Sequence, residues 1–394
     1  MRVLLSDGSG LTSRQVATRL ALAGHTVESL SPDPFCLTRF TRHVKRVHRV
    51  PAYGLDPLGW LEAALGTLRA GGHDVFFPTQ EQAALLAREA DAVRSLGAGL
   101  AVPPFESLVQ VQDKVSAFET LRSVDLPQPP GFVARTSEEL TAAVVPSFVK
   151  APIGTATMGV VHVHDRADLA SISIDGGVLV QEPVAGPLVM IQALFDRGRL
   201  VALHANLRVR EGVRGGASHK ESVALPVVGE HLTRLGEVLH WHGALSLDAI
   251  VTADGPSYID VNPRLVEPGN AWHAGTDLVG TMLELSLGRT VEPLPPSRPE
   301  VRTHQTLLAL LGAAEDGGGR RGVVRELRAA RRGRGDYTGS VEELTPLRGD
   351  PPTAALLAGV AGALVARPSS WEWFSSGSVE AYALTPAAWR TVLG

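Results

Sequence analysis

Two short segments near the middle of the chain carry the polar side chains best suited to chemistry. The first contains Asp248, and the second, after a turn, contains Asp260, Asn262 and Arg264. Successive side chains of a strand alternate between its faces, so the last three residues would start on one face. An arginine there could neutralise charge where a phosphoryl group moves.

The register of the predicted hairpin decides whether the carboxylates meet. If Val251 pairs with Ser257, Asp248 falls opposite Asp260, although a connection longer by one residue would change this pairing. Two carboxylates and the amide oxygen of Asn262 would then converge. Oxygen ligands of this kind suit Mg²⁺ bridging phosphate oxygens. The alternative is a polar sheet face with a turn cap at Asn262.

A lysine followed by a glycine-containing loop forms a second candidate site. Lys150 ends an apolar run, and the next residues place glycines at positions 154 and 159 and threonines at 155 and 157. The lysine could reach a phosphate, and the loop amides could fold over a polyphosphate. Because the lysine precedes the glycines, the segment is not a P-loop. An ordinary hairpin with a mobile tip is the alternative.

The elements around these residues indicate two architectures. A β-α-β pattern opens the chain and predicts a doubly wound parallel sheet. After the prolines at 127–130, successive hairpins predict an antiparallel sheet. We expect a first domain over 1–110, a second over 111–292 with a lid subdomain at about 126–184, and an α+β region over 293–394.

Composition excludes several classes of function. The net charge of −4 and the 5% aromatic content argue against nucleic-acid or anionic-membrane partners. A single cysteine, Cys36, excludes an intrachain disulfide and a cysteine-built zinc site. We expect the Gly/Arg-rich segment 317–335 to be an exposed helix and loop. Neither a signal peptide nor a membrane span is evident, which predicts a cytoplasmic protein.

Two turns of the first domain carry weaker signals. The turn with Gly8 and Gly10 lacks the full dinucleotide fingerprint, so a tight structural turn is expected there. Glu81 begins a helix where a strand ends. It could face a ligand or simply complement the helix dipole.

Several loose motifs occur in one characteristic order. They are Lys114, Pro127-Gln128-Pro129, Lys150 with its glycine loop, Gln181 to Gly186, Asp248, and Asp260 to Arg264. In this order and spacing, residues 1–290 resemble the ATP-grasp superfamily, in the branch of biotin carboxylase, carbamoyl-phosphate synthetase and the amino-acid ligases. The resemblance implies an ATP-grasp fold, of mixed α/β and α+β class.

The resemblance also implies roles for the matching residues. Those expected to bind ATP are Lys114, Lys150, Gly154, Thr155, Ala156, Thr157, Gly159, Gln181, Glu182, Pro183 and Val184. Those expected to hold one or two Mg²⁺ ions are Asp248, Asp260 and Asn262. The expected catalytic set is Arg264, Lys150 and Glu267. Aspartates stand where relatives commonly have glutamates, so the number of metal ions stays open.

Candidates for the substrate side are less distinct. They are Arg208, His219, Lys220 and Asn270, with His219 and Lys220 expected in an exposed, mobile loop. Arg208 could anchor a carboxylate or lie on a solvated edge. Glu267 could orient an amine or be a salt-bridge partner.

The expected function is an ATP-dependent ligase that joins a small carboxylic acid to an amine and releases ADP and phosphate. The alternatives are a bicarbonate-activating carboxylase and a nucleotide-binding regulator without catalysis. No nucleic-acid or membrane partner is expected, and a homodimer is possible within the family pattern.

Overall fold

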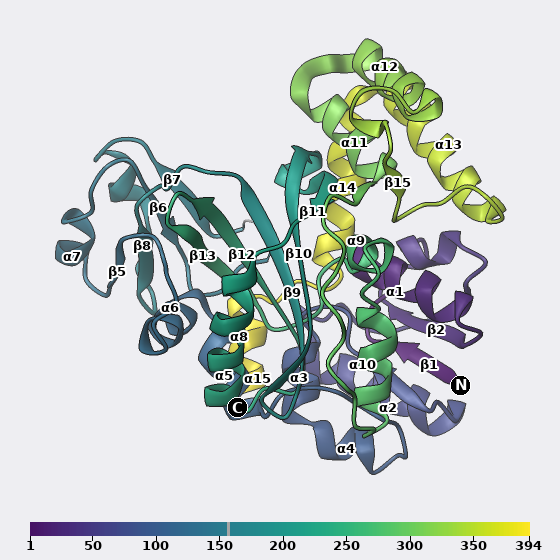
Figure 1. The fold of residues 1–394 in the computed structure, drawn as a ribbon, viewed down its shortest axis with the longest axis horizontal. Coiled ribbons are helices and arrows are strands. Elements are labelled where there is room, and N and C mark those ends of the chain that lie inside the picture. Colours follow the sequence, from purple (N-terminus) through teal and green to yellow (C-terminus); the bar gives the residue numbers. More distant parts are fainter. Residues whose placement is uncertain (156–157) are drawn as a thin grey trace.

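An all-parallel sheet forms the N-terminal region of the computed structural model, which describes residues 1–155 and 158–394 (Figure 1). Its strands are β1 (Arg2–Leu5), β2 (Thr26–Ser31), β3 (Val44–Arg49) and β4 (Val75–Phe77), in the order β3-β2-β1-β4. The helices of this region are α1 (Leu11–Leu22), α2 (Pro57–Gly71), α3 (Ala83–Arg88), α4 (Ala90–Arg94) and α5 (Phe105–Gln112). The predicted doubly wound parallel sheet is confirmed.

Both faces of this sheet are buried, which explains its continuously apolar strands. Leu4 points into a cluster with Trp60 of α2, whereas Leu5 points into a cluster with Val16 of α1. The second cluster also contains Met282 of α10 (Leu278–Ser286), a helix more than two hundred residues further along the chain. The N-terminal sheet is therefore covered partly by the region that follows it.

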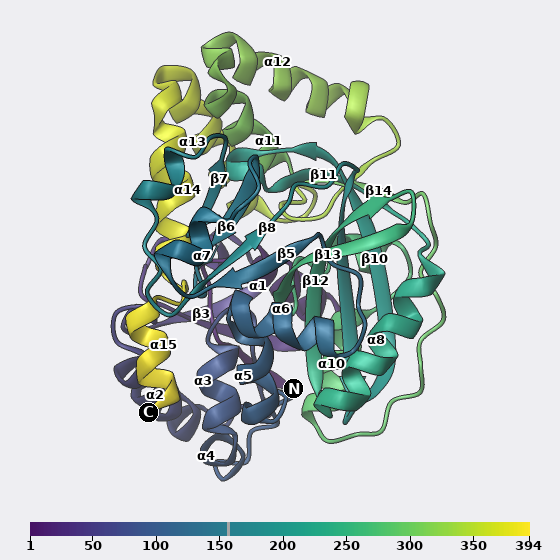
Figure 2. The ribbon, with the colours of Figure 1, turned by 90° about the vertical axis from the view of Figure 1, so that its left-hand side faces the viewer.

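A small antiparallel sheet forms the lid subdomain, which stands to one side of the central sheet and faces the viewer in Figure 2. Its strands, in spatial order, are β5 (Gly131–Ala134), β8 (Val178–Gln181), β6 (Ser147–Lys150) and β7 (Val160–Val163). Helices α6 (Lys114–Ser123) and α7 (Ser137–Thr141) accompany it. The strands lie inside the range expected for the lid.

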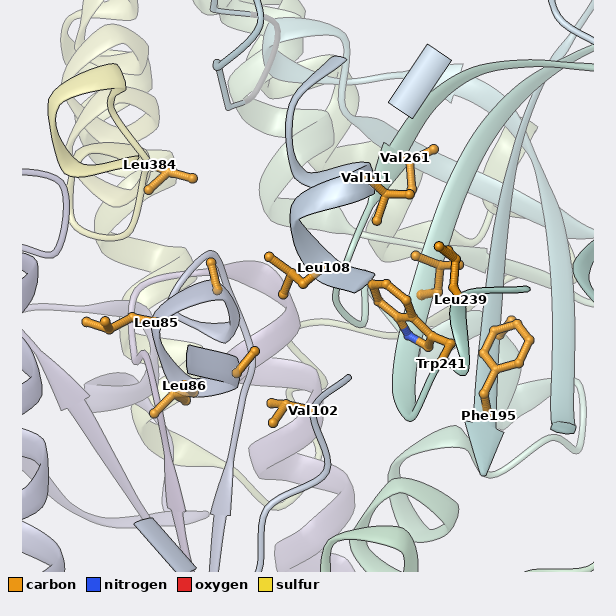
Figure 3. Close-up of a cluster of buried hydrophobic side chains, with 14 of the residues drawn as sticks. Leu85, Leu86, Val102, Leu108, Val111, Phe195, Leu239, Trp241, Val261 and Leu384 are labelled. Atoms are coloured by element: carbon orange, nitrogen blue, oxygen red, sulfur yellow. The ribbon is translucent and has the colours of Figure 1, made fainter. Parts of the chain in front are cut away.

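The central sheet has seven strands. In spatial order they are β13 (Gly255–Asn262), β12 (Gly243–Thr252), β9 (Leu188–Asp196), β10 (Arg199–Glu211), β11 (Ala217–Ser222), β14 (Arg302–His304) and β15 (Val341–Glu342). Helices α8 (Pro226–Leu239) and α9 (Gly269–His273) belong to this region. Figure 3 shows Phe195 of β9 and Trp241 in the same apolar cluster as Leu85 of α3.

The C-terminal region has no sheet of its own among the described residues. Its two strands extend the central sheet, and its remaining elements are helices. These helices are α11 (Thr306–Ala313), α12 (Gly319–Arg332), α13 (Pro351–Ala366), α14 (Trp371–Glu380) and α15 (Pro386–Leu393). The arginine-rich segment 317–335 contains the whole of α12, whose first and last turns are largely exposed, as expected. In the part of the chain that the structure describes, no helix is long and apolar enough to cross a membrane.

A buried ion pair joins the N-terminal and C-terminal regions. Arg14 of α1 is fully buried, and its Nη2 lies 2.9 Å from Oδ2 of Asp350, just before α13. The same carboxylate accepts hydrogen bonds from the Thr41 hydroxyl at 2.6 Å and the Arg42 amide at 3.0 Å. Removing the guanidinium would leave a buried carboxylate without its cation, which is more costly than losing an exposed pair.

Arg14→Met should therefore lower the free energy of unfolding by about 3–5 kcal/mol. Arg19→Met, on the same helix, is the matched control because the Arg19–Asp277 pair is partly exposed, and it should cost no more than about 1 kcal/mol. Urea denaturation of both variants measures the difference. Equal losses would show that burial of the Arg14 pair is not what holds the two regions together.

Candidate functional site

The hairpin of β12 and β13 places the two predicted metal-binding aspartates side by side. Asp248 is the cross-strand partner of Asp260. The predicted pairing of Val251 with Ser257 is wrong, because Val251 pairs with Pro256. A register shift near residue 259 inserts one extra residue into β13 and brings the aspartates opposite each other. Two departures from the predicted register thus cancel at the site.

The electrostatics of the aspartate pair fit a divalent cation. Burial, together with the neighbouring charge of Asp260, raises the pKa of Asp248 to about 7. Asn262, opposite Ser246, adds an amide oxygen on the same hairpin. Carboxylate and amide oxygens are ligands that Mg²⁺ accepts, and a cation between the carboxylates would relieve their repulsion.

Two lysines from different elements approach this hairpin. Nζ of Lys114, in α6, lies 3.2 Å from Oδ1 of Asp260. Nζ of Lys150, at the end of β6, donates to the carbonyl oxygen of Ile259 at 2.7 Å. Burial lowers the pKa of Lys150 to about 8, although Asp260 opposes this shift. For Lys114, burial also disfavours the charged form, but Asp260 outweighs it and the pKa is raised.

The glycine loop after Lys150 connects the lid to the rest of the site. A side chain at Gly154 would place its Cβ 1.9 Å from the carbonyl oxygen of Met158, and Gly159 has a φ of +77°. Both positions therefore favour glycine. Lys114 Nζ reaches the carbonyl of Gly154 at 3.4 Å. The predicted loop residues Ala156 and Thr157 lie outside the described residues.

Arg264 is held by a carboxylate from the N-terminal region. Its Nη2 lies 3.2 Å from Oε1 of Glu81, and the hydroxyl of Thr155 lies 3.4 Å from the same oxygen. Glu81, for which the sequence left two interpretations open, is thus the partner of a predicted catalytic residue. It joins three separate segments at one point.

Glu267 belongs to a buried network of charges. Nζ of Lys220 lies 2.6 Å from Oε2 of Glu267 and 2.5 Å from Oε1 of Glu343, and Gln305 donates to Glu267 as well. Glu267 also adopts a φ of +43°, which is uncommon for a residue other than glycine. Glu267 is therefore a salt-bridge partner in this structure, and its contacts hold its backbone in this uncommon conformation.

The expectation of a mobile loop at His219 and Lys220 is wrong. Both residues are buried in β11, which pairs with β10 on one side and β14 on the other. An interior strand leaves no exposed loop, and burial lowers the pKa of His219 to about 4. The pairing strand β14 lies about eighty residues later, so no local pattern reveals it.

Two other substrate candidates are fully engaged with the protein. The amide of Asn270 binds His204 Nε2 at 2.9 Å and the Thr303 hydroxyl at 2.7 Å. Arg208 donates to the carbonyl of Gly215 at 2.8 Å and pairs with Glu211 at 2.5 Å. These contacts give neither side chain an evident role toward a substrate.

The predicted ATP-binding residues 181–184 begin at the last residue of β8. Gln181 is buried at the end of the strand, whereas Glu182 and Pro183 are exposed and Val184 is half-buried. The amide of Glu182 donates to the carbonyl of Pro130 at 2.8 Å. This bond fixes the segment to the beginning of the lid.

Sequence reasoning missed Glu343 and Gln305 entirely. Each lies in the C-terminal region and reaches the site only because β14 and β15 join the central sheet. Nothing in their local sequence marks them, since Lys220 and Glu343 are separated by 123 positions. A long-range contact of this kind has no sequence pattern.

Comparison with known proteins gives one family and one relative. Residues 111–268 match the model of an ATP-grasp domain. The arginine-specific large chain of carbamoyl phosphate synthase from Geobacillus stearothermophilus is 24% identical over 206 residues, covering 48% of this chain. The match spans only 20% of the length of that relative.

Solved structures share the fold at low sequence identity. The biotin carboxylase domain of Hydrogenobacter thermophilus 2-oxoglutarate carboxylase, solved with MgADP and bicarbonate, is 16% identical with a TM-score of 0.62. That match covers 76% of this chain and 73% of the other. N5-carboxyaminoimidazole ribonucleotide synthetase from Thermus thermophilus is 18% identical, with a TM-score of 0.56 over 77% of this chain and 81% of the other. The hairpin, lysines and loop described above all lie within residues 111–268, which match an ATP-grasp domain, and the chain shares its fold with these solved structures.

Proposed function

We propose that this protein is an ATP-dependent, ADP-forming ligase that activates a carboxylate as an acyl phosphate and transfers the acyl group to an amine. The observation that carries the proposal is the approach of Lys114 and Lys150 to the paired aspartates of the β12–β13 hairpin. Phosphoryl transfer depends mainly on positioning and on neutralising charge, and this arrangement supplies both.

Each part of the site has a role in the proposed reaction. Lys114 and Lys150 bind phosphate oxygens of ATP, and the loop from Gly154 to Gly159 covers them. Asp248, Asp260 and Asn262 would hold Mg²⁺, which when bound supplies positive charge to the phosphates. No protein nucleophile is needed, because the substrate carboxylate itself attacks the γ-phosphate.

Arg264 acts after phosphoryl transfer. Its guanidinium, held by Glu81, would stabilise the acyl phosphate and the charge that develops as the amine attacks. Glu267, fixed by Lys220 and Gln305, lies three residues further along the chain. In this proposal it also orients the amine.

A bicarbonate-activating carboxylase is the second candidate, favoured by the fold shared with biotin carboxylases. The two candidates differ in what triggers ADP formation. Turnover that requires a carboxylic acid together with an amine supports the ligase, whereas turnover that requires bicarbonate supports the carboxylase. A phosphate-release screen of small acids and amines, alone and in pairs, separates them.

Lys150→Ala should reduce ADP formation at least ~100-fold, because it removes one of the positive charges that neutralise the transferred phosphoryl group. Lys45→Ala, an exposed lysine in β3, is the matched control and should retain full activity. ADP release is measured for each purified protein, and circular dichroism verifies the fold. Unchanged turnover in the Lys150 variant would remove this lysine from the site.

Gly154→Ala should raise the KM for ATP roughly tenfold, because the new Cβ would overlap the Met158 carbonyl and displace the loop that covers the nucleotide. Gly66→Ala provides the control, since a Cβ at this helical position meets no atom within 4 Å. Initial rates over a range of ATP concentrations give the comparison. A normal KM in the Gly154 variant would show that the loop does not close over ATP.

The raised pKa of Asp248 predicts that this residue lowers the free energy of unfolding of the metal-free protein, and that the loss depends on pH. A carboxyl with a pKa of about 7 in the folded state and 3.8 ordinarily is protonated on folding at mildly acidic pH, so its contribution to stability improves as the pH falls from 8 to 5. Asp248→Asn, which carries no charge, should stabilise the protein by about 1–2 kcal/mol at pH 8, less than the full shift because the side chain is partly exposed.

Urea denaturation in the presence of a chelator tests this effect at pH 8 and pH 5. The advantage of the Asn variant should shrink at pH 5, where the wild-type carboxyl is itself neutral. MgATP should stabilise the wild type more than the variant, since it binds the folded state. The same stability difference at both pH values would contradict the assignment.

A further inference from the structure

A second polar group of residues lies in the N-terminal region, where β1 and β4 end. The strand-end cluster, as we call it, consists of Ser6, Asp7, Thr79, Gln80 and Glu81. In the sheet order β3-β2-β1-β4, the chain continues from β1 to β2 on one side of β1, whereas β4 lies on the other side of β1. Ligands of open parallel sheets bind outside the carboxyl ends of strands at such a point. Ser6 Oγ accepts from the amide of Thr79 at 2.9 Å, which fixes the two strand ends together.

The backbone amides of the turn after β1 are already hydrogen-bonded to a carboxylate of the protein, that of Asp7. Oδ2 of Asp7 accepts hydrogen bonds from the amides of Ser9 at 2.8 Å and Gly10 at 2.7 Å, and from the Ser13 hydroxyl at 3.0 Å. A phosphate would compete with this carboxylate for the same amides. The turn is therefore structural, as the sequence indicated, and the cluster is not a second nucleotide site.

The other oxygen of Asp7 is available for a ligand. Oδ1 is buried and has no hydrogen-bond partner within residues 1–155 and 158–394, and the same holds for Oε1 of Gln80 and of Gln82. A carboxylate can only accept hydrogen bonds, and a buried acceptor without a donor costs about 1–3 kcal/mol. The missing group is therefore a hydrogen-bond donor.

Residues from two regions contact the first turn of α1. The Ser13 hydroxyl bonds Asp7 and also lies 2.9 Å from Thr79 Oγ1, two residues before Glu81. One residue earlier, Thr12 accepts the amide of Glu267 at 3.0 Å. The strand-end cluster is thus joined directly to the residues that follow Arg264.

Negative charge exceeds positive charge in this part of the molecule. Glu81 is paired with Arg264, whereas Lys220 is shared by Glu267 and Glu343. Asp7 has no cationic partner among the described residues, and burial raises its pKa to about 6. With all four carboxylates ionised, two cations leave an excess of two negative charges, which a bound cation would offset.

The C-terminal region borders the same charges through Tyr382. Burial raises the pKa of its hydroxyl; Arg264 opposes this shift, and Asp7, Glu81 and Glu267 add to it. Charges from the N-terminal region and the central sheet therefore act on one hydroxyl from the C-terminal region. The C-terminal region therefore comes close enough to the cluster for these charges to act on it.

We infer that the strand-end cluster binds the acyl acceptor, and that this acceptor is a primary amine that binds as an ammonium group donating to Oδ1 of Asp7. It passes one proton to that carboxylate before its nitrogen attacks the acyl phosphate, and the second proton leaves with the displaced phosphate. The inference rests on the ligase function proposed above and names the class of its second substrate. Because Glu81 bonds both Arg264 and Thr155, an amine held here lies beside the group assigned to the acyl phosphate.

The test measures the binding of glycinamide, alaninamide and 1,4-diaminobutane, each against its neutral hydroxyl counterpart, by thermal shift and by stimulation of ADP formation. The wild type should respond to amines and not to the hydroxyl compounds. Asp7→Asn keeps an oxygen for the turn and presents an N–H group to the ligand, so it should weaken amine binding at least ~10-fold. Its KM for ATP should stay close to that of the wild type.

Asp33→Asn is the matched control, because Asp33 also caps a turn after a strand of this sheet, accepting from the Phe35 amide at 2.8 Å, and should leave amine binding unchanged. Gln80→Met removes a neighbouring acceptor and leaves the Asp7 carboxylate with its amide donors. It is the second variant if Asp7→Asn folds poorly, and it should weaken amine binding about threefold or more.

Equal responses to amines and hydroxyl compounds, or amine binding unaffected by both cluster variants, would overturn the inference. The proposed function has a separate test, since it fails if Lys150→Ala retains ADP formation. Loss of ADP formation in that variant, with no effect of the cluster variants on amine binding, would reject the amine site alone.

Discussion

Two carboxylates that repel each other must be kept opposite one another inside the protein. Asp248 and Asp260 meet this condition because they lie on adjacent strands, where backbone hydrogen bonds and a bulge fix their register. Holding them together costs stability in the absence of a cation, as the raised pKa of Asp248 indicates. The lysines, the glycine loop and the Arg264–Glu81 pair are arranged around this one constraint. A more relaxed hairpin would be more stable and would bind a cation less well.

The type of basic side chain used at the site agrees with this arrangement. The chain contains four lysines among 37 basic residues, and three of them, Lys114, Lys150 and Lys220, lie buried or half-buried in or beside the site. Lysine is a compact charge whose pKa responds to its surroundings, whereas arginine stays charged. Elsewhere the chain uses arginine almost exclusively. Lysine is thus found mainly where a point charge meets a carboxylate or where phosphate is expected.

Much of the fold and part of the site could be predicted from the sequence, for physical reasons that differ between residues. The parallel N-terminal sheet, the lid strands and the hairpin with Asp248 and Asp260 follow from local patterns, since turns and alternation act over a few residues. His219 and Lys220 were misplaced because β11 is an interior strand only through pairing with β14, which is distant in sequence. The partnership of Glu81 with Arg264 and that of Lys220 with Glu343 depend on packing between regions, which no local pattern encodes.

The pairing of β14 and β15 with the central sheet affects the order in which the protein can be completed during synthesis. Until residues 302–304 and 341–342 have left the ribosome, one side of β11 has no neighbouring strand, and Lys220 has only one of its two carboxylate partners. A nascent chain ending near residue 290 would contain every segment that resembles the family, yet would expose an unpaired strand edge. The outer pair of strands can therefore join the sheet only late in synthesis, and its addition seals a buried lysine between two acids.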